Sequence, residues 1–543
     1  ECQRGDWKLH KAKCKRLTEI VVDTDAKNRL RSGALKRRLL TLSQGTIILT
    51  IRDPDITTIG DMNLTEERVH EAPFLDCKSL LRVDLKGCTK LASVGNGAFA
   101  ACSSLTSVVL PDSLTQVGEN AFQDCTSLTS VVLPDSLTQL GNFAFGRCTS
   151  LTSVVLPDSL TQLGVAAFGK CTSLTSVVIP DSLTQLGDGA FEDCTSLTSV
   201  VLPESLTQLG KAAFQYCSSL TSMVLPDSLT QLGERAFGCC TSLTSVVLPD
   251  SLTQICKAAF GGCTSLTSVV FQDSLTEIGK WAFQECTSLT SVVLPDSLTQ
   301  LGKAAFLGCT SLTSVVLPDS LTQLDRNAFQ ECTSLTSVVL PDSLTQLSDA
   351  VFFECSSLTS VVLPDSLTHI RDSAFQDCTS LTSVVLPDSL TQLGDRAFGW
   401  CISLTSVVLP DSLTQLSEGV FCNCTSLTYV VMPDSAELGD DVFMDCNALV
   451  DKAALAGFNS VEPYLRDRYI SITLRKLVLR LLRKYNQAVN NAYGTEAEKH
   501  VSALAQFPAD DSGSLEVGLF AQKMNISGGD GVIGLVGYIL KFV

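Results

Sequence analysis

Apolar residues recur at fixed positions along most of this chain, in a pattern that repeats every 23 residues. Fifteen cysteines mark the pattern, from Cys102 to Cys424. A constant period of 20 to 29 residues with leucine at set offsets is typical of a solenoid, in which each copy forms one turn of chain and buries its apolar side only against its neighbours. We call each 23-residue copy a coil.

The first half of each coil alternates between apolar and exposed positions. In the coil that follows Cys125, Leu128, Val131 and Leu133 have the spacing L-x-x-L-x-L. This alternation predicts a short strand that points those three side chains inward and the side chains of Ser130 and Val132 outward.

The second half of the coil returns the chain to the interior. Pro134 and Asp135 end the strand, and a glycine at 141 allows the chain to bend. The further inward positions are Leu137, Leu140, Ala144, Phe145 and Cys148. Stacked coils turn each such position into a column, such as the phenylalanine column from Phe99 to Phe443.

The repeated order L-x-x-V-x-L-P-x-S-L-T-x-L-G-x-x-A-F-x-x-C resembles the BspA-like leucine-rich repeats, over about 400 of the 543 residues. The expected fold class is a leucine-rich-repeat solenoid of 23-residue coils with short parallel strands. The resemblance implies a non-enzymatic protein-protein interaction scaffold. A surface or secreted adhesive leucine-rich-repeat protein is the alternative that the repeat family suggests.

Departures from the pattern predict the limits of the array. Residues 44–101 hold degenerate N-terminal capping repeats, and 102–446 hold the regular ones. Residues 447–493 are expected to form a C-terminal helical cap, with the best helix candidate at 463–489, where apolar and basic residues separate on two faces. A basic helix that docks on an acidic edge or a membrane is the alternative. Residues 494–543 are expected to form a loose segment and a short apolar helix.

Charge is concentrated in the array. The chain has a formal net charge of −18. Residues 89–446 have a net charge of −24, whereas the segments before and after them have net charges of +4 and +2. One acidic position per coil accounts for fifteen charges, including Asp135, Asp158 and Asp181. Either each carboxylate accepts backbone N–H bonds of its own turn, or the column is an edge that binds cations or a basic partner. The acidic balance argues against nucleic-acid binding.

A stripe of valines is predicted beside the acidic column, and we expect the valines together with Asp135, Asp158 and Asp181 to form the partner-binding face. The stripe includes Val132, Val155, Val178 and Val201. Exposed apolar stripes usually mark contact surfaces or aggregation risk. The strand positions hardly vary between coils, which favours a repetitive partner, self-association, or recent duplication without fine specificity.

The cysteine column could suggest disulfides between coils. Side chains of one column point the same way rather than toward each other, so buried free thiols that act as small hydrophobes are the favoured interpretation. A protein with free thiols is expected in a reducing compartment, which favours an intracellular location, in the cytoplasm or nucleus.

The N-terminus carries the one chemical motif. Cys2, His10 and Cys14 have the spacing C-x7-H-x3-C, and an H-x3-C pair suits one tetrahedral zinc. With Gln3 and Trp7, these residues resemble the last third of a MYND zinc finger. The resemblance implies two interleaved zinc sites, both incomplete here, and a groove at Gln3 and Trp7 for proline-containing peptides.

Three further expectations concern the rest of the chain. Residues 1–16 would be a partial MYND-type finger of a longer protein, and 17–43 a helical linker. The four histidines are far apart in sequence and no catalytic constellation is apparent, so no enzyme activity is expected. The last apolar run, 532–543, is too short to span a bilayer.

Overall fold

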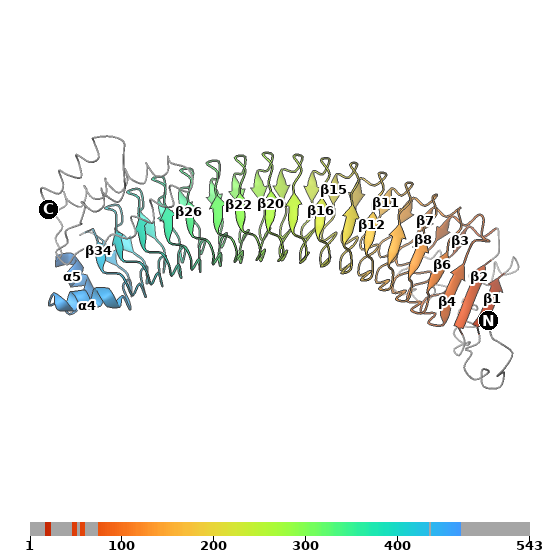
Figure 1. The fold of residues 1–543 in the computed structure, drawn as a ribbon, viewed down its shortest axis with the longest axis horizontal. Helices are drawn as coiled ribbons and strands as arrows, with labels where there is room; N and C mark the ends of the chain where they lie inside the picture. The colour runs from red at the N-terminus through yellow and green to blue at the C-terminus, as the bar shows by residue number, and fades with distance from the viewer. Residues whose placement is uncertain (1–16, 23–45, 52–54, 60–73, 434–435, 468–543) are drawn as a thin grey trace, which may run out of the picture. The chain divides into compact units, whose positions relative to one another are not determined.

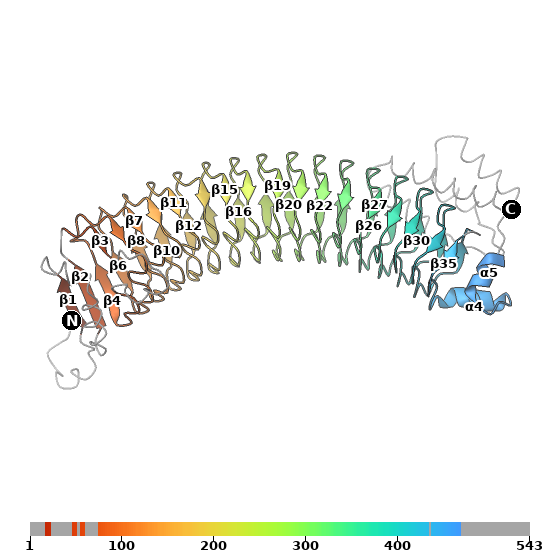
Figure 2. The same cartoon turned by 180° about the vertical axis from the view of Figure 1, so that it is seen from behind.

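The computed structural model describes residues 17–22, 46–51, 55–59, 74–433 and 436–467. They divide into two units, the first ending at Ser274 and the second beginning at Leu275. Within each unit the strands lie side by side in chain order, and the same stacking is seen from behind (Figures 1 and 2). The expected solenoid of short parallel strands is confirmed.

The first unit begins with strands of uneven length: β1 Leu17–Val22, β2 Thr46–Ile51, β3 Thr58–Ile59, β4 Leu80–Asp84 and β5 Ser93–Val94. β1 pairs with β2 in parallel, residue for residue from Leu17 with Thr46. The expectation of a helical linker is therefore wrong for 17–22. The β-branched segment LTEIVV finds a strand edge to pair with, which overrides helix formation. Residues 23–43 lie outside the described part.

Two series of strands build the regular coils of the first unit. The three-residue series is β6 Ser107–Val109, β8 Ser130–Val132, β10 Ser153–Val155, β12 Ser176–Val178, β14 Ser199–Val201, β16 Ser222–Val224, β18 Ser245–Val247 and β20 Ser268–Val270. The two-residue series is β7 Gln116–Val117, β9 Gln139–Leu140, β11 Gln162–Leu163, β13 Gln185–Leu186, β15 Gln208–Leu209, β17 Gln231–Leu232 and β19 Gln254–Ile255.

The second unit repeats both series. Its three-residue strands are β22 Ser291–Val293, β24 Ser314–Val316, β26 Ser337–Val339, β28 Ser360–Val362, β30 Ser383–Val385, β32 Ser406–Val408 and β34 Tyr429–Val431. Its two-residue strands are β21 Glu277–Ile278, β23 Gln300–Leu301, β25 Gln323–Leu324, β27 Gln346–Leu347, β29 His369–Ile370, β31 Gln392–Leu393, β33 Gln415–Leu416 and β35 Glu437–Leu438.

Pairing keeps equivalent positions of consecutive coils in register. In the first unit Ser130 pairs with Ser153 and Val132 with Val155. Because a one-residue slip would turn every inward side chain outward, this register keeps each column of like residues intact.

The interior of each unit is filled by the predicted columns. Phe145 is fully buried, and its ring stacks on those of Phe122 and Phe168 with centroids 5.2 and 5.5 Å apart. Such stacked pairs continue from Phe74 to Phe260 in the first unit and from Phe283 to Phe443 in the second. Burial of these rings and of the leucine columns is the main favourable term in folding.

The turn that carries the variable residues of each coil uses left-handed backbone at two positions. In one coil these are Phe143 and Arg147, with φ of 53° and 60°. Glycine takes the first of these positions at Gly189, with φ of 61°. Non-glycine residues in this region carry local strain, which the interlocked coils sustain.

Two short helices follow the last coil: α4 Asn447–Leu455 and α5 Val461–Asp467. Leu449 and Ala453 of α4 are buried. Phe458 and Tyr464 meet edge to face with centroids 5.8 Å apart, which holds α5 beside α4. Residues 468–493 of the expected helical cap and 494–543 lie outside the described part.

Candidate functional site: the strand face

The outward side of the three-residue strands presents a column of exposed valines. Each such strand buries its middle residue and exposes the two around it in most coils of the first unit. Val132 is 80% exposed whereas Val131 is 5% exposed. The equivalent valines Val155, Val178 and Val201 are 79, 62 and 57% exposed. We use the name strand face for these outward residues, and the structure places all four sequence-predicted valines on it.

Hydroxyl groups beside the strand face already have partners within the solenoid. The Oγ1 hydroxyl of Thr152 donates a hydrogen bond to the carbonyl oxygen of Thr129, 3.2 Å away in the preceding coil, and Thr175 donates to Thr152 in the same way. Because these donors are used between coils, the threonines stabilise the stack rather than offer hydroxyl donors to a ligand.

The acidic column lies at the end of each strand, in the turn after the proline. Leu137 donates its N–H to the carbonyl oxygen of Pro134 at 3.0 Å, and the hydroxyl of Ser136 donates to that of Leu114 at 2.7 Å. The carboxylate of Asp135 is exposed and accepts no hydrogen bond from any residue that the structure describes. The interpretation that it caps its own turn is therefore wrong, because the amide it would accept from is bonded to Pro134.

The same arrangement recurs at Asp158 and Asp181, both of them exposed. Ion pairs of the array form elsewhere, on the variable turns, as between Arg147 and Asp124 at 3.8 Å or Lys170 and Asp193 at 3.7 Å. The first unit thus carries a column of uncompensated negative charge next to its column of apolar side chains.

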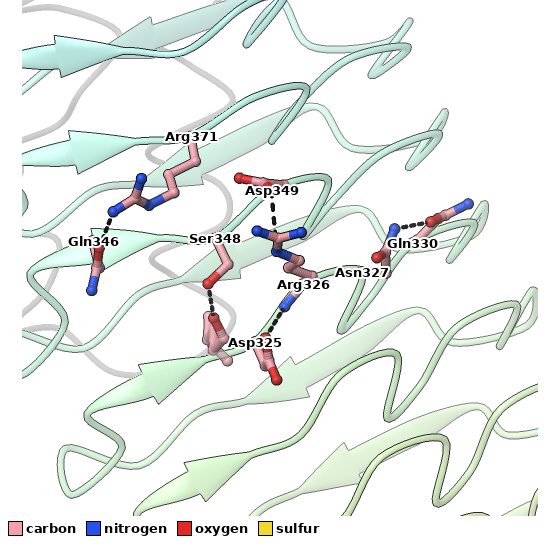
Figure 3. Close-up of polar contacts among 9 residues, drawn as sticks. Asp325, Arg326, Asn327, Gln330, Gln346, Ser348, Asp349 and Arg371 are labelled. Atoms are coloured by element: carbon pink, nitrogen blue, oxygen red, sulfur yellow. Dashed lines mark hydrogen bonds and ion pairs between the residues drawn. The ribbon is translucent and has the colours of Figure 1, made fainter.

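A polar cluster in the second unit breaks the uniformity of the array (Figure 3). A glycine follows most two-residue strands, and it is replaced in three consecutive coils by Asp325, Ser348 and Arg371. Ser348 donates its hydroxyl to the carbonyl oxygen of Leu324 at 2.7 Å, and Arg371 donates to the side chain of Gln346 at 3.0 Å. The loss of three successive glycines is the sequence signal that could have identified this cluster.

Neighbouring charges extend the cluster toward the variable turns. The Arg326 guanidinium lies 3.2 Å from the carboxylate of Asp349 in the next coil, and the side-chain amide of Asn327 donates to that of Gln330 (Figure 3). These coil-specific contacts distinguish three coils from the rest, whereas the strand face itself does not vary there in sequence.

One open hollow lies on the strand face of the first unit, among the described residues. Its volume is about 370 Å³, and it is lined by Met223, Val224, Leu225, Asp227, Val247, Leu248, Pro249, Asp250 and Gln272. The lining combines apolar side chains with two carboxylates of the acidic column. This composition suits contact with a partner surface more than a chemical step, since it provides no nucleophile with an adjacent base.

The described cysteines are all free thiols, and those of the column are buried. Burial raises the pKa of the Cys125 and Cys171 thiols to about 12. Each thiol also donates a hydrogen bond, as from Cys171 to the carbonyl oxygen of Phe145 at 3.2 Å. Because only a thiolate reacts readily with oxidants, such thiols stay reduced whatever the compartment, and they carry no information on location.

The expected zinc and peptide-binding residues, Cys2, Gln3, Trp7, His10 and Cys14, lie outside the described residues, so their roles stay predictions. Within the described ranges, no group of three or more histidine, cysteine or acidic side chains is placed to hold a metal ion. None of the helices described in the structure has the length and apolar character needed to cross a bilayer.

Comparisons with known proteins agree with the coil geometry. The family model described as "BspA type Leucine rich repeat region (6 copies)" matches residues 67–197, 139–265, 236–357 and 322–450. No curated protein matches the chain.

Several solved structures are similar to parts of the chain. A leucine-rich repeat protein from Bacteroides ovatus is 25% identical, with 75% of this chain and 86% of that chain covered and a TM-score of 0.42. A leucine rich cell surface protein from Faecalibacterium prausnitzii is 30% identical, with 54 and 82% covered and a TM-score of 0.39. A leucine-rich repeat protein from Eubacterium ventriosum is 21% identical, with 63 and 88% covered and a TM-score of 0.40.

These comparisons correct the expected location. The match to the BspA type of leucine-rich repeat points away from the cytoplasm or nucleus. The intracellular interpretation rested on the free thiols, which their burial explains, and on the finger motif, whose residues lie outside the described part of the chain.

Membership of a family follows from the extent of the repeat match. The four overlapping matches run from residue 67 to residue 450 and so cover more than half of the 543 residues. Leucine-rich repeats of this kind generally form protein-interaction surfaces without chemistry of their own. The chain belongs to the BspA type leucine-rich repeat family.

Proposed function

We propose that this protein is a surface or secreted adhesive protein, which binds protein partners through the strand face of its first unit. The observation that carries the proposal is the pairing of two uncompensated columns, the exposed valines that include Val132 and Val155 and the exposed carboxylates that include Asp135 and Asp158. A broad apolar stripe bordered by charge is typical of a contact surface.

The uniformity of the face also limits the kind of partner. Equivalent strand positions differ little between coils, so the face offers the same chemistry at each step of about 4.8 Å. A partner that is itself repetitive, or present in many copies, can engage several coils at once and gain avidity from weak individual contacts. We therefore expect binding that depends on the number of intact coils rather than on one residue.

Attachment of protein-coated beads to cells tests the proposal. Beads that carry the full chain are compared with beads that carry a variant with Val132, Val155, Val178 and Val201 changed to threonine. Threonine keeps the shape of valine. Because the four positions are exposed, the substitutions should not impair folding, and a loss of attachment would reflect a loss of binding. We expect attachment to fall at least about tenfold when four exposed apolar contacts are lost together.

A matched control carries Val165→Thr and Phe143→Ser on the variable turn, where the side chains are 40 and 38% exposed. This control should attach as well as the unchanged chain. Equal attachment by the strand-face variant and the control would rule out the strand face as the adhesive surface. Protease treatment of intact producing cells is the accompanying test of location, since a surface protein is cleaved before the cells are lysed.

Zinc binding at Cys2, His10 and Cys14, with peptide recruitment at Gln3 and Trp7, stays a separate proposal that the adhesive role does not require. Zinc content of the purified chain, measured with and without Cys14→Ser, would test it.

A further inference from the structure

The variable turns of the second unit carry a column of charged residues whose sign changes once along the array. We call it the turn column, and it is the second residue after each two-residue strand. In the second unit its cations come first and its acids follow: Lys280, Lys303, Arg326, Asp349, Asp372, Asp395, Glu418 and Asp440. The same position in the first unit has no such order: Glu119, Asn142, Val165, Asp188, Lys211, Glu234 and Lys257.

Backbone hydrogen bonds keep the turn column in register across the change of sign. The carbonyl oxygen of each column residue after Lys280 accepts the N–H of a residue in the preceding coil. These bonds run from Trp281, Ala304, Asn327, Ala350 and Ser373 to Lys303, Arg326, Asp349, Asp372 and Asp395, with N···O distances of 2.9 to 3.1 Å. The charges therefore follow one another at a constant step of about 4.8 Å.

Two of the three cations have no ionic partner among the residues that the structure describes. Lys280 is exposed and Lys303 is half-buried, and neither makes an ion pair within that part of the chain. Arg326 differs, because its guanidinium lies 3.2 Å from the carboxylate of Asp349 in the next coil (Figure 3). The two lysines are thus uncompensated on one side of the change of sign.

The acids on the other side are fixed in position but keep their charge. Oδ1 of Asp372 accepts the N–H of Asp395 at 3.0 Å, and Oδ1 of Asp395 accepts that of Glu418 at 3.2 Å. Both aspartates are exposed, and neither makes an ion pair with a described residue. Because the backbone already holds these carboxylates, little side-chain freedom is lost when a cation binds them. Glu418 is paired with Arg396 of its own chain at 3.3 Å.

We infer that the second unit binds the second unit of another copy of this chain, with the two turn columns antiparallel. A two-fold axis between Arg326 and Asp349 brings Lys303 opposite Asp372 of the other copy, and Lys280 opposite Asp395. Because the column has the same step on both sides of the axis, a single placement matches all these charges, and each pair occurs twice. A parallel placement would bring like charges together.

The centre of the column suits such an approach. The Arg326–Asp349 pairs of the two copies would lie side by side across the axis, as a network of four charges. The residues that follow the column at the centre are small, namely Asn327, Ala350 and Ser373. No bulky side chain at that position keeps the two columns apart.

Exposed ion pairs are individually weak and are screened by salt, so we expect a weak dimer that depends on ionic strength. The inference does not depend on the adhesive function, which concerns the strand face of the first unit. A dimer would, however, give each assembly two strand faces and so raise its avidity for a repetitive partner.

Sedimentation velocity of the full chain at micromolar concentrations tests the inference. We expect a monomer–dimer equilibrium at low ionic strength that shifts to the monomer in about 1 M salt, where the Debye length is about 3 Å. An acidic variant carries Lys280→Glu and Lys303→Glu, and a basic variant carries Asp372→Lys and Asp395→Lys. Each variant alone places like charges opposite one another, so its dissociation constant should rise at least about tenfold.

A mixture of the two variants tests the antiparallel pairing itself. In a mixed dimer the acids of the acidic variant face the lysines of the basic variant at all four contacts. The mixture should therefore form a heterodimer with a dissociation constant within about threefold of that of the unchanged chain. General repulsion or a folding defect would not be relieved by mixing.

Asp296→Lys with Asp319→Lys is the matched control, since it alters the net charge as the basic variant does, at exposed positions of the acidic column. This control should dimerise like the unchanged chain. Lysine already occupies the turn column at Lys280 and Lys303, so the basic variant should fold, and its circular dichroism spectrum checks this. A monomeric unchanged chain at low ionic strength would overturn the inference. So would a dimer that survives in both charge variants, or a mixture that stays monomeric.

Discussion

The thiol of Cys148 donates a hydrogen bond to the carbonyl oxygen of Phe122, 3.2 Å away in the neighbouring coil. The same bond recurs along the column, so the cysteine links coils as well as filling space. A buried thiol that is both desolvated and hydrogen-bonded as a donor is held in its protonated form.

Stability should decrease at alkaline pH. Burial raises the pKa of the Cys171 thiol from 9.0 to about 12, so the unfolded chain releases this proton before the folded one does. The contribution is complete below pH 9 and declines between pH 9 and 12, because the unfolded state then binds fewer protons. Denaturant titrations at pH 7 and 10.5 should show the loss. Cys171→Ala should show a smaller pH dependence, and an identical one would contradict the prediction.

The stacked phenylalanines should be the most sensitive core positions. Phe145→Ala removes a fully buried ring between two others and should lower the free energy of unfolding by about 3 to 5 kcal/mol. Phe143→Ala is the control two residues away, because Phe143 is 38% exposed and its loss should cost within about 0.5 kcal/mol. Comparable losses for both variants would show that the ring column is not the principal source of stability.

Exchange of alanine and glycine at positions with left-handed backbone should change the stability of the protein in opposite directions. Ala212 has φ of 53°, and Gly189, the equivalent residue one coil earlier, has φ of 61°. Ala212→Gly should stabilise the chain and Gly189→Ala should destabilise it, because alanine is strained in left-handed backbone and glycine is not. Each effect should be about 1 kcal/mol, since the greater freedom of glycine in the unfolded state offsets part of the strain. Thermal unfolding of the two variants checks the opposite signs. The same sign for both would contradict the assigned backbone.

Where a glycine follows a two-residue strand, it should allow close stacking of the coils. A Cβ atom at Gly164 would lie 2.5 Å from the backbone carbon of Gly141 in the preceding coil. Gly164→Ala should therefore cost about 1 to 3 kcal/mol through a forced separation of coils. Gly189→Ala is again the comparison, since its nearest atom would be a flexible Glu192 oxygen at 3.3 Å. A smaller loss at Gly164 than at Gly189 would contradict this explanation.

The acidic column should be destabilising rather than structural. Asp135, Asp158 and Asp181 accept no hydrogen bond from described residues, so their replacement by asparagine removes repulsion without breaking a turn. Repulsion between neighbours is at most about 1 kcal/mol per pair in water and decreases with salt. At low ionic strength the triple variant should melt at a higher temperature than the unchanged chain. In 1 M salt the two should melt at the same temperature, because the Debye length is then about 3 Å and the repulsion is screened. A lower melting temperature would restore the capping role.

Periodicity predicted the fold because each inward position repeats often enough to identify its environment. Leu128, Val131 and Phe145 could be assigned to the interior from their columns alone, and all three are buried. The role of Asp135 could not be predicted in this way. The pattern does not show that the Leu137 amide is already bonded to Pro134, which leaves the carboxylate without a capping role.

Burial at β28 could not be read from the strand sequence either. Val339 and Val362 occupy equivalent positions in identical Ser-Val-Val strands, yet one is 44% exposed and the other 3%. A repeat pattern assigns equivalent positions the same environment, so it cannot predict such a difference. β1 was missed for a related reason, since its partner strand begins 29 residues further along the chain.

The hydrogen bonds between threonines of neighbouring coils allow the number of coils to change without loss of the fold. Each hydroxyl donates to a residue 23 positions earlier, and coils such as those of Thr152 and Thr175 make the same bonds. Deletion or duplication of one whole coil therefore leaves every donor with an equivalent acceptor. Recombination between the near-identical coding repeats can lengthen or shorten the protein in steps of one coil without a folding defect, and close variants should differ in length by multiples of that step.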